Sequence, residues 1–268
     1  MTAVCEATLT GEIITGYWNK RAKSYSNGVV GELSDNRLSA WDRVIARETE
    51  GLFAQAASEG RTPRVLDLGC GPGFFSVLFA NRGCRVDAVD ASCNMIERAR
   101  ANVSEFSSPE SVTFHCLDVT SLPFENNPFD LAISRNLTWL MREPEAAYAE
   151  WMRVLRPGGK LLVFDANWYR YLVDPAINAA RLADQVGNTL DGWDIEAHAT
   201  SDEEKRCEAM AAQLPLTPVL RPAWDIVTLE SLGASSVSAN ESIWEELWTE
   251  NEKSFYGSSP MFMVKAVK

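Results

Sequence analysis

Apolar residues recur with two different periods along the chain, and their alternation predicts the fold class. Short apolar runs of the length typical of buried strands alternate with segments that carry apolar residues at helical spacing. Strands that alternate with helices predict an α/β fold whose parallel sheet is covered on both faces. The expected strands cover residues 64–68, 84–90, 112–117, 129–134 and 160–165, and the expected helices between them include 94–103 and 143–155.

The segments that flank this alternation follow other patterns. An aromatic stripe predicts a helix over residues 12–26, which Gly28 and Gly31 are expected to end, and a second helix follows over 35–59. Residues 167–222 hold several aromatic side chains, Trp193 among them, and we expect a mostly helical insertion that lies over the ligand edge of the sheet. The rest of the fold is expected from a helix at 224–232 and strands at 235–239 and 261–267.

Length and composition fit one folded domain over residues 1–268. Apolar residues make up 46% of the chain, which excludes a mainly disordered protein. The expected parts are N-terminal helices that form a lid over residues 12–60, a cofactor-binding core over 64–165, a substrate-side insertion over 167–222 and the end of the sheet over 224–268.

The charge of the chain argues against nucleic acid as a partner. Its 37 acidic residues outnumber 25 basic ones, and a formal net charge of −12 repels phosphate backbones and anionic lipid. No apolar run is long enough to span a bilayer and no secretory signal is visible, so we expect a cytoplasmic protein without membrane insertion. The sequence does not predict an oligomeric state.

The six cysteines are expected to be reduced thiols. They stand singly, and no pair has the Cys-x-x-Cys spacing typical of zinc or redox motifs, so we expect no metal site. Several fall in expected strands or helices, which is typical of buried thiols in a cytoplasmic protein. Cys70 is expected to be a small buried residue rather than a nucleophile, because nothing suggests a base beside it.

A glycine-dense turn at Gly69–Gly73 directly follows the first expected strand. Its three alternating glycines let the backbone turn sharply and approach a ligand where a Cβ would collide. The helix that follows points its free N–H groups toward the same place. Asp67 ends the first strand, and Asp90 and Asp118 come at the ends of the second and third. Because ligands of such sheets bind outside the carboxyl ends of the strands, these groups predict one small-molecule site.

Five motifs in this order resemble those of the class I S-adenosylmethionine-dependent methyltransferases. The likeness covers about residues 64–165 and is closest to the small-molecule group that includes the ubiquinone- and menaquinone-type enzymes. It implies a seven-stranded, mostly parallel, Rossmann-like doubly wound sheet, with S-adenosylmethionine as methyl donor, S-adenosylhomocysteine as product, and a small-molecule acceptor with an N, O, S or C nucleophile. The motifs are Val65-Leu66-Asp67-Leu68-Gly69-Cys70-Gly71-Pro72-Gly73, Val89-Asp90-Ala91-Ser92 with Met95, Leu117-Asp118-Val119, Phe129-Asp130 and Leu155-Arg156-Pro157-Gly158-Gly159-Lys160.

The resemblance also implies which residues hold the methyl donor. The glycine turn would pack against its methionine part, with Asp67 near the amino group. Asp90 would accept from both ribose hydroxyls, since a carboxylate offers two acceptor oxygens, and Asp118 would accept from the adenine amine. The full set of expected contacts is Tyr17, Tyr25, Asp67, Gly69, Cys70, Gly71, Gly73, Asp90, Ala91, Met95, Asp118, Val119 and Arg135.

Two other functions stay open at this point. A dinucleotide-dependent oxidoreductase would need the spacing G-x-G-x-x-G, whereas this turn has G-x-G-x-G with Phe74 where the third dinucleotide glycine would stand. A cofactor-binding interaction module without methyl transfer is the second alternative, because the sequence shows no evident catalytic base.

Residues after the fourth and fifth strands are the candidates for the acceptor side. Arg135 also suits a bidentate pair with an anionic substrate group. Aromatic residues of the insertion favour a partly enclosed apolar pocket for a ring or another hydrophobic metabolite. His198, in the insertion, is a further catalytic candidate, and no catalytic residue is assigned. The candidate substrate-binding residues are Asn136, Trp139, Asn167, Trp168 and Tyr169.

Overall fold

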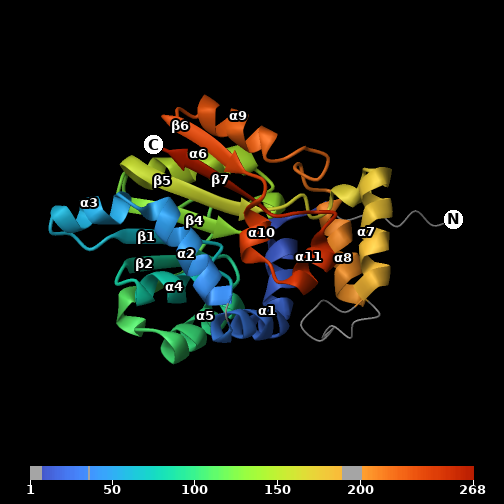
Figure 1. Ribbon diagram of the computed structural model, residues 1–268, viewed down its shortest axis with the longest axis horizontal. Helices are drawn as coiled ribbons and strands as arrows, with labels where there is room; N and C mark the ends of the chain where they lie inside the picture. Colours follow the sequence, from blue (N-terminus) through green and yellow to red (C-terminus); the bar gives the residue numbers. More distant parts are fainter. Residues whose placement is uncertain (1–7, 36, 189–200) are drawn as a thin grey trace.

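The structure is a computed structural model that describes residues 8–35, 37–188 and 201–268. The strands of this described part form a seven-stranded sheet with the order β3-β2-β1-β4-β5-β7-β6 (Figure 1). The first five strands pair in parallel, and β7 runs antiparallel to both β5 and β6. The Rossmann-like, mostly parallel sheet is therefore confirmed. Its strands are β1 (Arg64–Leu68), β2 (Arg85–Asp90), β3 (Val112–Cys116), β4 (Phe129–Arg135), β5 (Leu155–Asp165), β6 (Ser236–Asn240) and β7 (Phe262–Val267).

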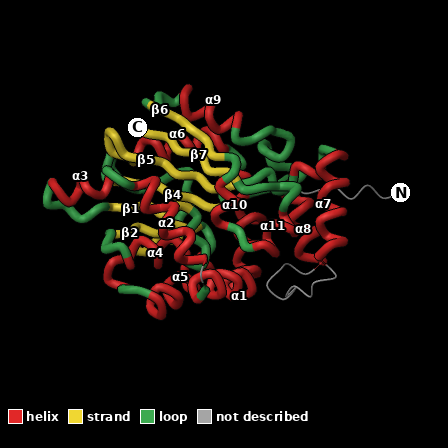
Figure 2. The backbone as a smooth tube through the Cα atoms, in the orientation of Figure 1, coloured by secondary structure: helices red, strands yellow, loops and turns green. Residues whose placement is uncertain are grey.

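Helices cover both faces of the sheet (Figure 2). The side chains of β1 alternate between these two layers. Val65 packs into the apolar cluster under one group of helices, whereas Leu66 and Leu68 pack into the cluster on the opposite face. The first face carries α2 (Arg37–Thr49), α4 (Phe74–Asn81), α5 (Cys93–Phe106) and α10 (Ile243–Leu247), and the second carries α6 (Pro144–Val154) and α9 (Ala223–Ser231).

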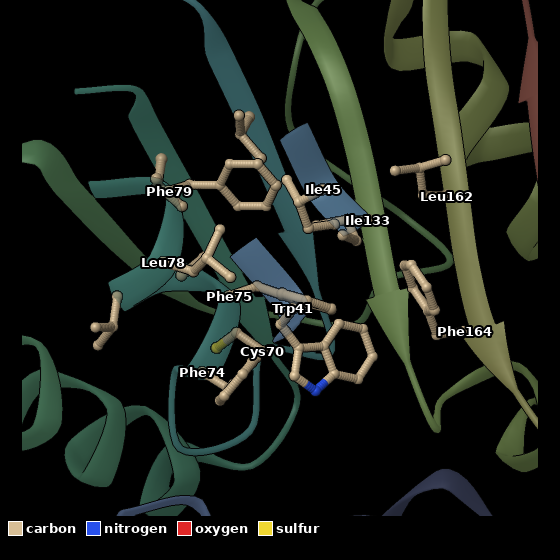
Figure 3. Packing of buried hydrophobic residues seen from close by; sticks show 14 of the residues in the cluster. Trp41, Ile45, Cys70, Phe74, Phe75, Leu78, Phe79, Ile133, Leu162 and Phe164 are labelled. Atoms are coloured by element: carbon tan, nitrogen blue, oxygen red, sulfur yellow. The ribbon is translucent and has the colours of Figure 1, made fainter. Parts of the chain in front are cut away.

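Trp41 of α2 is the centre of the first apolar layer (Figure 3). Its ring centroid lies 4.9 Å from that of Phe164 on β5, 5.3 Å from that of Phe75 and 5.7 Å from that of Phe74 at the start of α4. These edge-to-face contacts join the N-terminal helices to the sheet and to the helix that follows the glycine turn.

The N-terminal helices differ from the sequence prediction at both glycine positions. α1 (Gly11–Ser34) continues through Gly28 and Gly31, where an end was expected. Burial of Val29 and Leu33 offsets the roughly 1 kcal/mol by which a helical glycine is less favourable than alanine. The expected second helix is instead two helices, α2 and α3 (Leu52–Ser58), because Gly51 between them has a φ of 77°.

The insertion after β5 is mostly helical in its described part, as expected. It contains η3 (Arg170–Leu172), α7 (Pro175–Asn188) and α8 (Ser201–Ala211), which gather with α11 (Glu250–Tyr256) at the end of the molecule remote from α3 (Figure 1). Trp193 and His198 lie outside the described residues. The short helices η1 (Pro109–Ser111), η2 (Thr138–Leu140), α10 and α11 were not expected.

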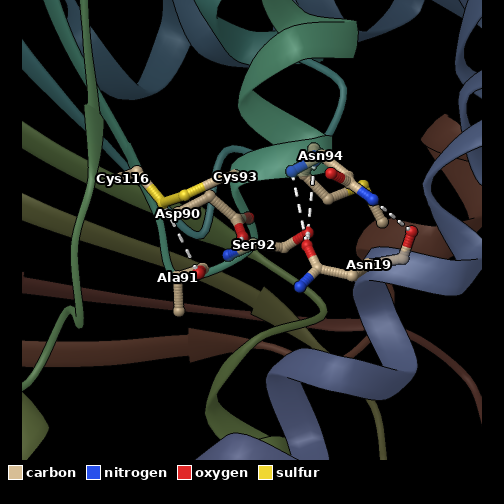
Figure 4. Close-up of a disulfide and its surroundings, with 8 residues drawn as sticks. Asn19, Asp90, Ala91, Ser92, Cys93, Asn94 and Cys116 are labelled. Carbon is tan, nitrogen blue, oxygen red and sulfur yellow. Dashed lines mark hydrogen bonds between the residues drawn. A yellow bond between two sulfur atoms is a disulfide. The ribbon is translucent and has the colours of Figure 1, made fainter.

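Two of the cysteines contradict the expectation of reduced thiols. Cys93, at the start of α5, forms a disulfide with Cys116, at the end of β3, across a separation of 23 residues (Figure 4). The parallel pairing of β2 with β3 brings the two Cα atoms within 5.3 Å, a proximity that linear spacing does not reveal. Cys70, Cys84 and Cys207 are free and buried, as expected.

The residues that the structure describes contain no helix long and apolar enough to cross a bilayer. They also bring together no group of three or more His, Cys, Asp or Glu side chains suited to hold a metal ion.

A buried ion network joins the end of β5 to α9. Arg221, whose side chain is 1% exposed, donates to Asp165 at 2.6 Å and to both oxygens of Asp225, at 2.6 and 2.9 Å. Tyr148 of α6 donates to Asp225 as well. Asp165 also accepts from the Trp139 amide at 3.0 Å, so the charged network fixes the loop after β4.

We expect Arg221→Met to lower the free energy of unfolding by about 3–5 kcal/mol, because it leaves two buried carboxylates without their cation. Without Arg221, the folded-state pKa of Asp165 rises further above its unfolded value, so the loss should be larger at about pH 8 than at about pH 5. Urea unfolding at both pH values measures this. The exposed Arg47, which pairs with Glu246, provides the control: Arg47→Met should cost about 1 kcal/mol or less. Equal losses for the two variants would contradict the assignment.

Candidate functional site

A cavity of about 280 Å³ lies at the carboxyl ends of β1, β2 and β4. The glycine turn, the loop after β2 and the segment after β3 form three of its sides, and α1 covers it. Residues from these parts of the chain lie far apart in sequence, and the parallel pairing of the strands brings them together. The lining includes Ile14, Trp18, Tyr25, Gly69, Gly71, Asp90, Ala91, Ser92, Met95, Asp118, Val119, Arg135, Asn136, Leu140 and Met141.

Each glycine of the turn has a positive φ, but the space around each differs. A Cβ on Gly69 would lie 2.6 Å from a methyl of Leu137, so a larger residue there would have to displace that side chain, although Gly69 itself lines the cavity. A Cβ on Gly71 would meet only the Tyr25 ring, at 3.8 Å, and Gly71 lines the cavity. Gly71 is therefore the position where the bare backbone can approach a ligand.

Gly73 has a packing role that the sequence did not reveal. It does not line the cavity, and a Cβ there would lie 3.1 Å from the Cβ and 3.2 Å from the Cα of Ala99 on α5. The glycine thus allows the start of α4 to pack directly against α5.

Asp90 holds the loops on either side of it. One carboxylate oxygen accepts from the Gly71 amide at 2.9 Å and the other from the Ser92 amide at 2.8 Å. Burial raises the pKa of Asp90 to about 6, although these amide bonds oppose the rise. Each oxygen has a further lone pair for a hydroxyl in the cavity.

Asp67 and Cys70 lie beneath the cavity and do not line it. Asp67 is buried and accepts from the Ser76 hydroxyl at 2.6 Å, and burial raises its pKa to about 7. Burial also raises the pKa of the Cys70 thiol well above its ordinary value, which fits a small packed residue rather than a nucleophile.

Asp118 and Val119, which follow β3, line the cavity together with Ala91 and Met95, which follow β2. Asp118 is exposed, and one of its oxygens accepts from both the amide and the hydroxyl of Thr120, at 2.8 and 2.7 Å. The Cys93–Cys116 disulfide joins the start of α5, directly after Ala91 and Ser92, to the end of β3, two residues before Asp118 (Figure 4).

Helix α1 is pinned over the cavity through polar contacts. The Asn19 side-chain oxygen accepts from the Ser92 hydroxyl at 2.7 Å, and its backbone oxygen accepts from the Asn94 side chain at 3.0 Å (Figure 4). Asn102 of α5 donates to the Ser26 hydroxyl at 3.2 Å. These contacts support the expected lid.

A second, larger cavity of about 550 Å³ adjoins the first. Trp18, Tyr25, Arg135 and Asn136 line both, so the two cavities meet at the end of β4. The remaining wall of the second cavity comes from α1, α2, η2, the insertion, α10, α11 and the segment that leads into β7. Its aromatic residues are Tyr17, Trp18, Tyr25, Trp41, Trp139, Trp168, Tyr169, Tyr171, Trp248, Phe255 and Tyr256.

Two polar residues lie at this junction. Arg135 pairs with Glu32 at 2.6 Å, and its guanidinium carbon lies 4.5 Å from the centre of the Phe74 ring. Asn136 has a φ of 57°, and its side-chain oxygen accepts from the Trp168 indole at 3.2 Å, while its backbone oxygen accepts from the Trp139 indole at 3.0 Å. Asn136 thereby fixes two aromatic walls of the second cavity.

The structure brings most of the expected site residues to one of the two cavities. Asn167 is an exception, because its side chain bonds to the backbone of Arg221 at 2.9 and 3.2 Å and lines neither of them. Trp18 was not expected at the junction, although its place in the N-terminal aromatic stripe was a signal. Of the expected cofactor contacts, the first cavity gathers Tyr25, Gly69, Gly71, Asp90, Ala91, Met95, Asp118, Val119 and Arg135; of the expected acceptor contacts, the second gathers Asn136, Trp139, Trp168 and Tyr169, together with Tyr17.

The similarity of the chain to known proteins includes the segment that carries the first cavity. Residues 66–163 match the family described as a methyltransferase domain. The chain is 28% identical over 218 residues to methyltransferase GfsG of Streptomyces halstedii. The aligned region covers 75% of this chain and 74% of that protein. It is 41% identical over 132 residues to the demethylmenaquinone methyltransferase of Renibacterium salmoninarum, and it spans only about half (49%) of that relative's length.

A solved structure of a candidate O-methyltransferase from Nostoc punctiforme has the same fold. Its TM-score is 0.56 at 16% identity, over 94% of this chain and 60% of that one. Fold, family match and relatives together support the resemblance to the class I S-adenosylmethionine-dependent methyltransferases, and the family match covers residues 66–163. Menaquinone-type enzymes are among its relatives in that class.

We expect Gly73→Ala to destabilise the fold more than Gly83→Ala. Both glycines have positive φ, at 89° and 72°, so both variants pay roughly 1–2 kcal/mol for a left-handed alanine. Only Gly73 also faces Ala99, and overpacking there should add about 1–3 kcal/mol to the loss of unfolding free energy. Urea unfolding of the two variants measures the difference. Equal losses would show that the contact with α5 relaxes without cost.

Proposed function

We propose that the protein transfers a methyl group from S-adenosylmethionine, held in the first cavity, to a small molecule that enters the second. The observation that carries this proposal is the junction of the two cavities at Trp18, Tyr25, Arg135 and Asn136. A methyl donor and its acceptor have to meet at such a junction, because transfer needs the reacting atoms in contact and in line.

The residues of the first cavity fit the methyl donor. Gly71 leaves the backbone bare, the Asp90 carboxylate suits the two ribose hydroxyls, and Asp118 with Val119 suits the polar edge of adenine. Ala91 and Met95 offer apolar contact to the adenine ring. Asp67 does not line the first cavity and bonds to Ser76 instead. Its expected effect near the amino group of the methyl donor would therefore be indirect, through the position of the glycine turn, rather than a direct contact.

When bound, S-adenosylmethionine supplies an activated methyl group on a sulfonium. The protein is then left to orient the acceptor and to exclude water. α1 covers the first cavity, and the indoles that Asn136 holds form the wall of the second where it meets the first.

We expect Asp90→Asn to weaken binding of S-adenosylhomocysteine by about tenfold or more, because a charged acceptor of the ribose hydroxyls is replaced by an amide. Isothermal titration calorimetry measures the dissociation constant. Asp87→Asn is the matched control, because Asp87 lies on the same strand, pairs with Arg64 and lines neither cavity, and its affinity should stay within about twofold. Equal affinity for wild type and Asp90→Asn, or preferential binding of NAD, would overturn the cofactor assignment.

The raised pKa of Asp90 predicts the pH dependence of that binding. With a pKa of about 6, the carboxylate is ionised at about pH 8 and mostly protonated at about pH 5. Since the ionised form accepts both hydroxyls, affinity for S-adenosylhomocysteine should fall as the pH drops through 6. Calorimetry across this range should show the fall in wild type and a flatter profile in Asp90→Asn. Parallel profiles would assign the titration to another group.

A further inference from the structure

We infer that the second cavity selects an uncharged, ring-bearing acceptor and rejects both anionic and cationic ones. This inference rests on the proposed function for the identity of the cavity as the acceptor site. It goes beyond that function by assigning the chemical class of the acceptor and the residues that enforce it.

The size and the walls of the cavity favour rings. A volume of about 550 Å³ is in the range that holds a drug-sized molecule rather than a two-carbon amine or alcohol. Trp139 and Tyr169 lie with ring centroids 4.8 Å apart, and Trp168 lies 5.4 Å from Tyr256. Flat apolar surfaces of this kind gain most from another flat apolar surface.

Every guanidinium that lines this cavity is already paired with a carboxylate of the chain itself. Arg135 pairs with Glu32 at 2.6 Å, and Arg181 pairs with Glu204 at 3.0 Å. Arg21 and Arg37 follow the same pattern, with Glu203 at 3.3 Å and with Asp35 and Glu252 at 2.7 and 3.4 Å. The described lining contains no lysine.

These pairs oppose ions of either sign. An anionic acceptor would have to displace a carboxylate from its arginine, and the displaced carboxylate would lose its partner in a partly desolvated wall. A cationic acceptor would meet carboxylates whose charge is already compensated, beside guanidiniums that repel it. A neutral molecule leaves every pair intact. The paired walls of the cavity therefore favour an uncharged acceptor over a charged one.

Neutral hydrogen-bonding groups in the same wall suit an uncharged polar substituent. Tyr169 donates to the Cys207 thiol at 3.0 Å, and burial raises the pKa of Tyr17, Tyr169 and Cys207, so these groups stay protonated. Because the one hydroxyl proton of Tyr169 is donated to Cys207, its phenol oxygen remains free to accept from a hydroxyl of the acceptor molecule.

Three naphthalene probes of matched shape test the inference: β-naphthol, β-naphthyl phosphate and β-naphthylmethylammonium. Calorimetry in the presence of saturating S-adenosylhomocysteine should show β-naphthol binding about tenfold or more tightly than either ion, the factor expected for one broken charged pair. Equal or tighter binding of the phosphate or the ammonium overturns the inference, and so does the failure of β-naphthol to bind.

A variant that releases one arginine gives a gain rather than a loss. Glu32→Gln removes the carboxylate partner of Arg135, so affinity for β-naphthyl phosphate should rise about fivefold or more while that for β-naphthol stays within about twofold. Glu246→Gln is the matched control, because it removes one of the two carboxylates that pair with Arg47 outside the cavity, and it should leave all three affinities unchanged. No gain in Glu32→Gln, with a thermal midpoint like that of wild type, contradicts the role of the pairs.

The first titration separates this inference from the function on which it rests. If S-adenosylhomocysteine does not bind, the proposed function fails. If it binds but the probes do not rank as stated, the proposed function stands and the assignment of the acceptor class is wrong.

Discussion

Burial of a guanidinium between two carboxylates is the constraint on which the acceptor side of this molecule depends. Arg221 is almost completely excluded from water, so Asp165 and Asp225 have to remain beside it. Asp165 in turn holds the amide of Trp139, and the Arg221 backbone holds the Asn167 side chain. A charge cluster that contacts no ligand therefore sets the positions of the segments after β4 and β5, from which the wall of the second cavity is built.

The two cavities are held by different means. The first is built from short loops at strand ends, and Asp90 ties two of them through backbone amides. The second is built from helices that are remote in sequence, and aromatic packing and paired charges hold it together. Arg135 and Asn136 belong to both, so a change at the end of β4 reaches both ligands at once.

The features that depend on local sequence patterns could be predicted from the sequence. The strand periods and the edge shared by Gly71, Asp90 and Asp118 follow from spacing and from parallel topology. Features that depend on tertiary proximity could not be predicted. The contact of Gly73 with Ala99 is one, and the Cys93–Cys116 bond is another, because spacing along the chain carries no sign of either. Helix α1 continued through two glycines because its buried apolar face outweighed their local preference.

The Cys93–Cys116 bond makes a closed ring of the chain between the start of α5 and the end of β3. The residues just before Cys93 and those shortly after Cys116 both line the first cavity. Neither segment can move away from the other at its base, because the disulfide tethers them there. The two segments that line this part of the first cavity should consequently move together rather than independently.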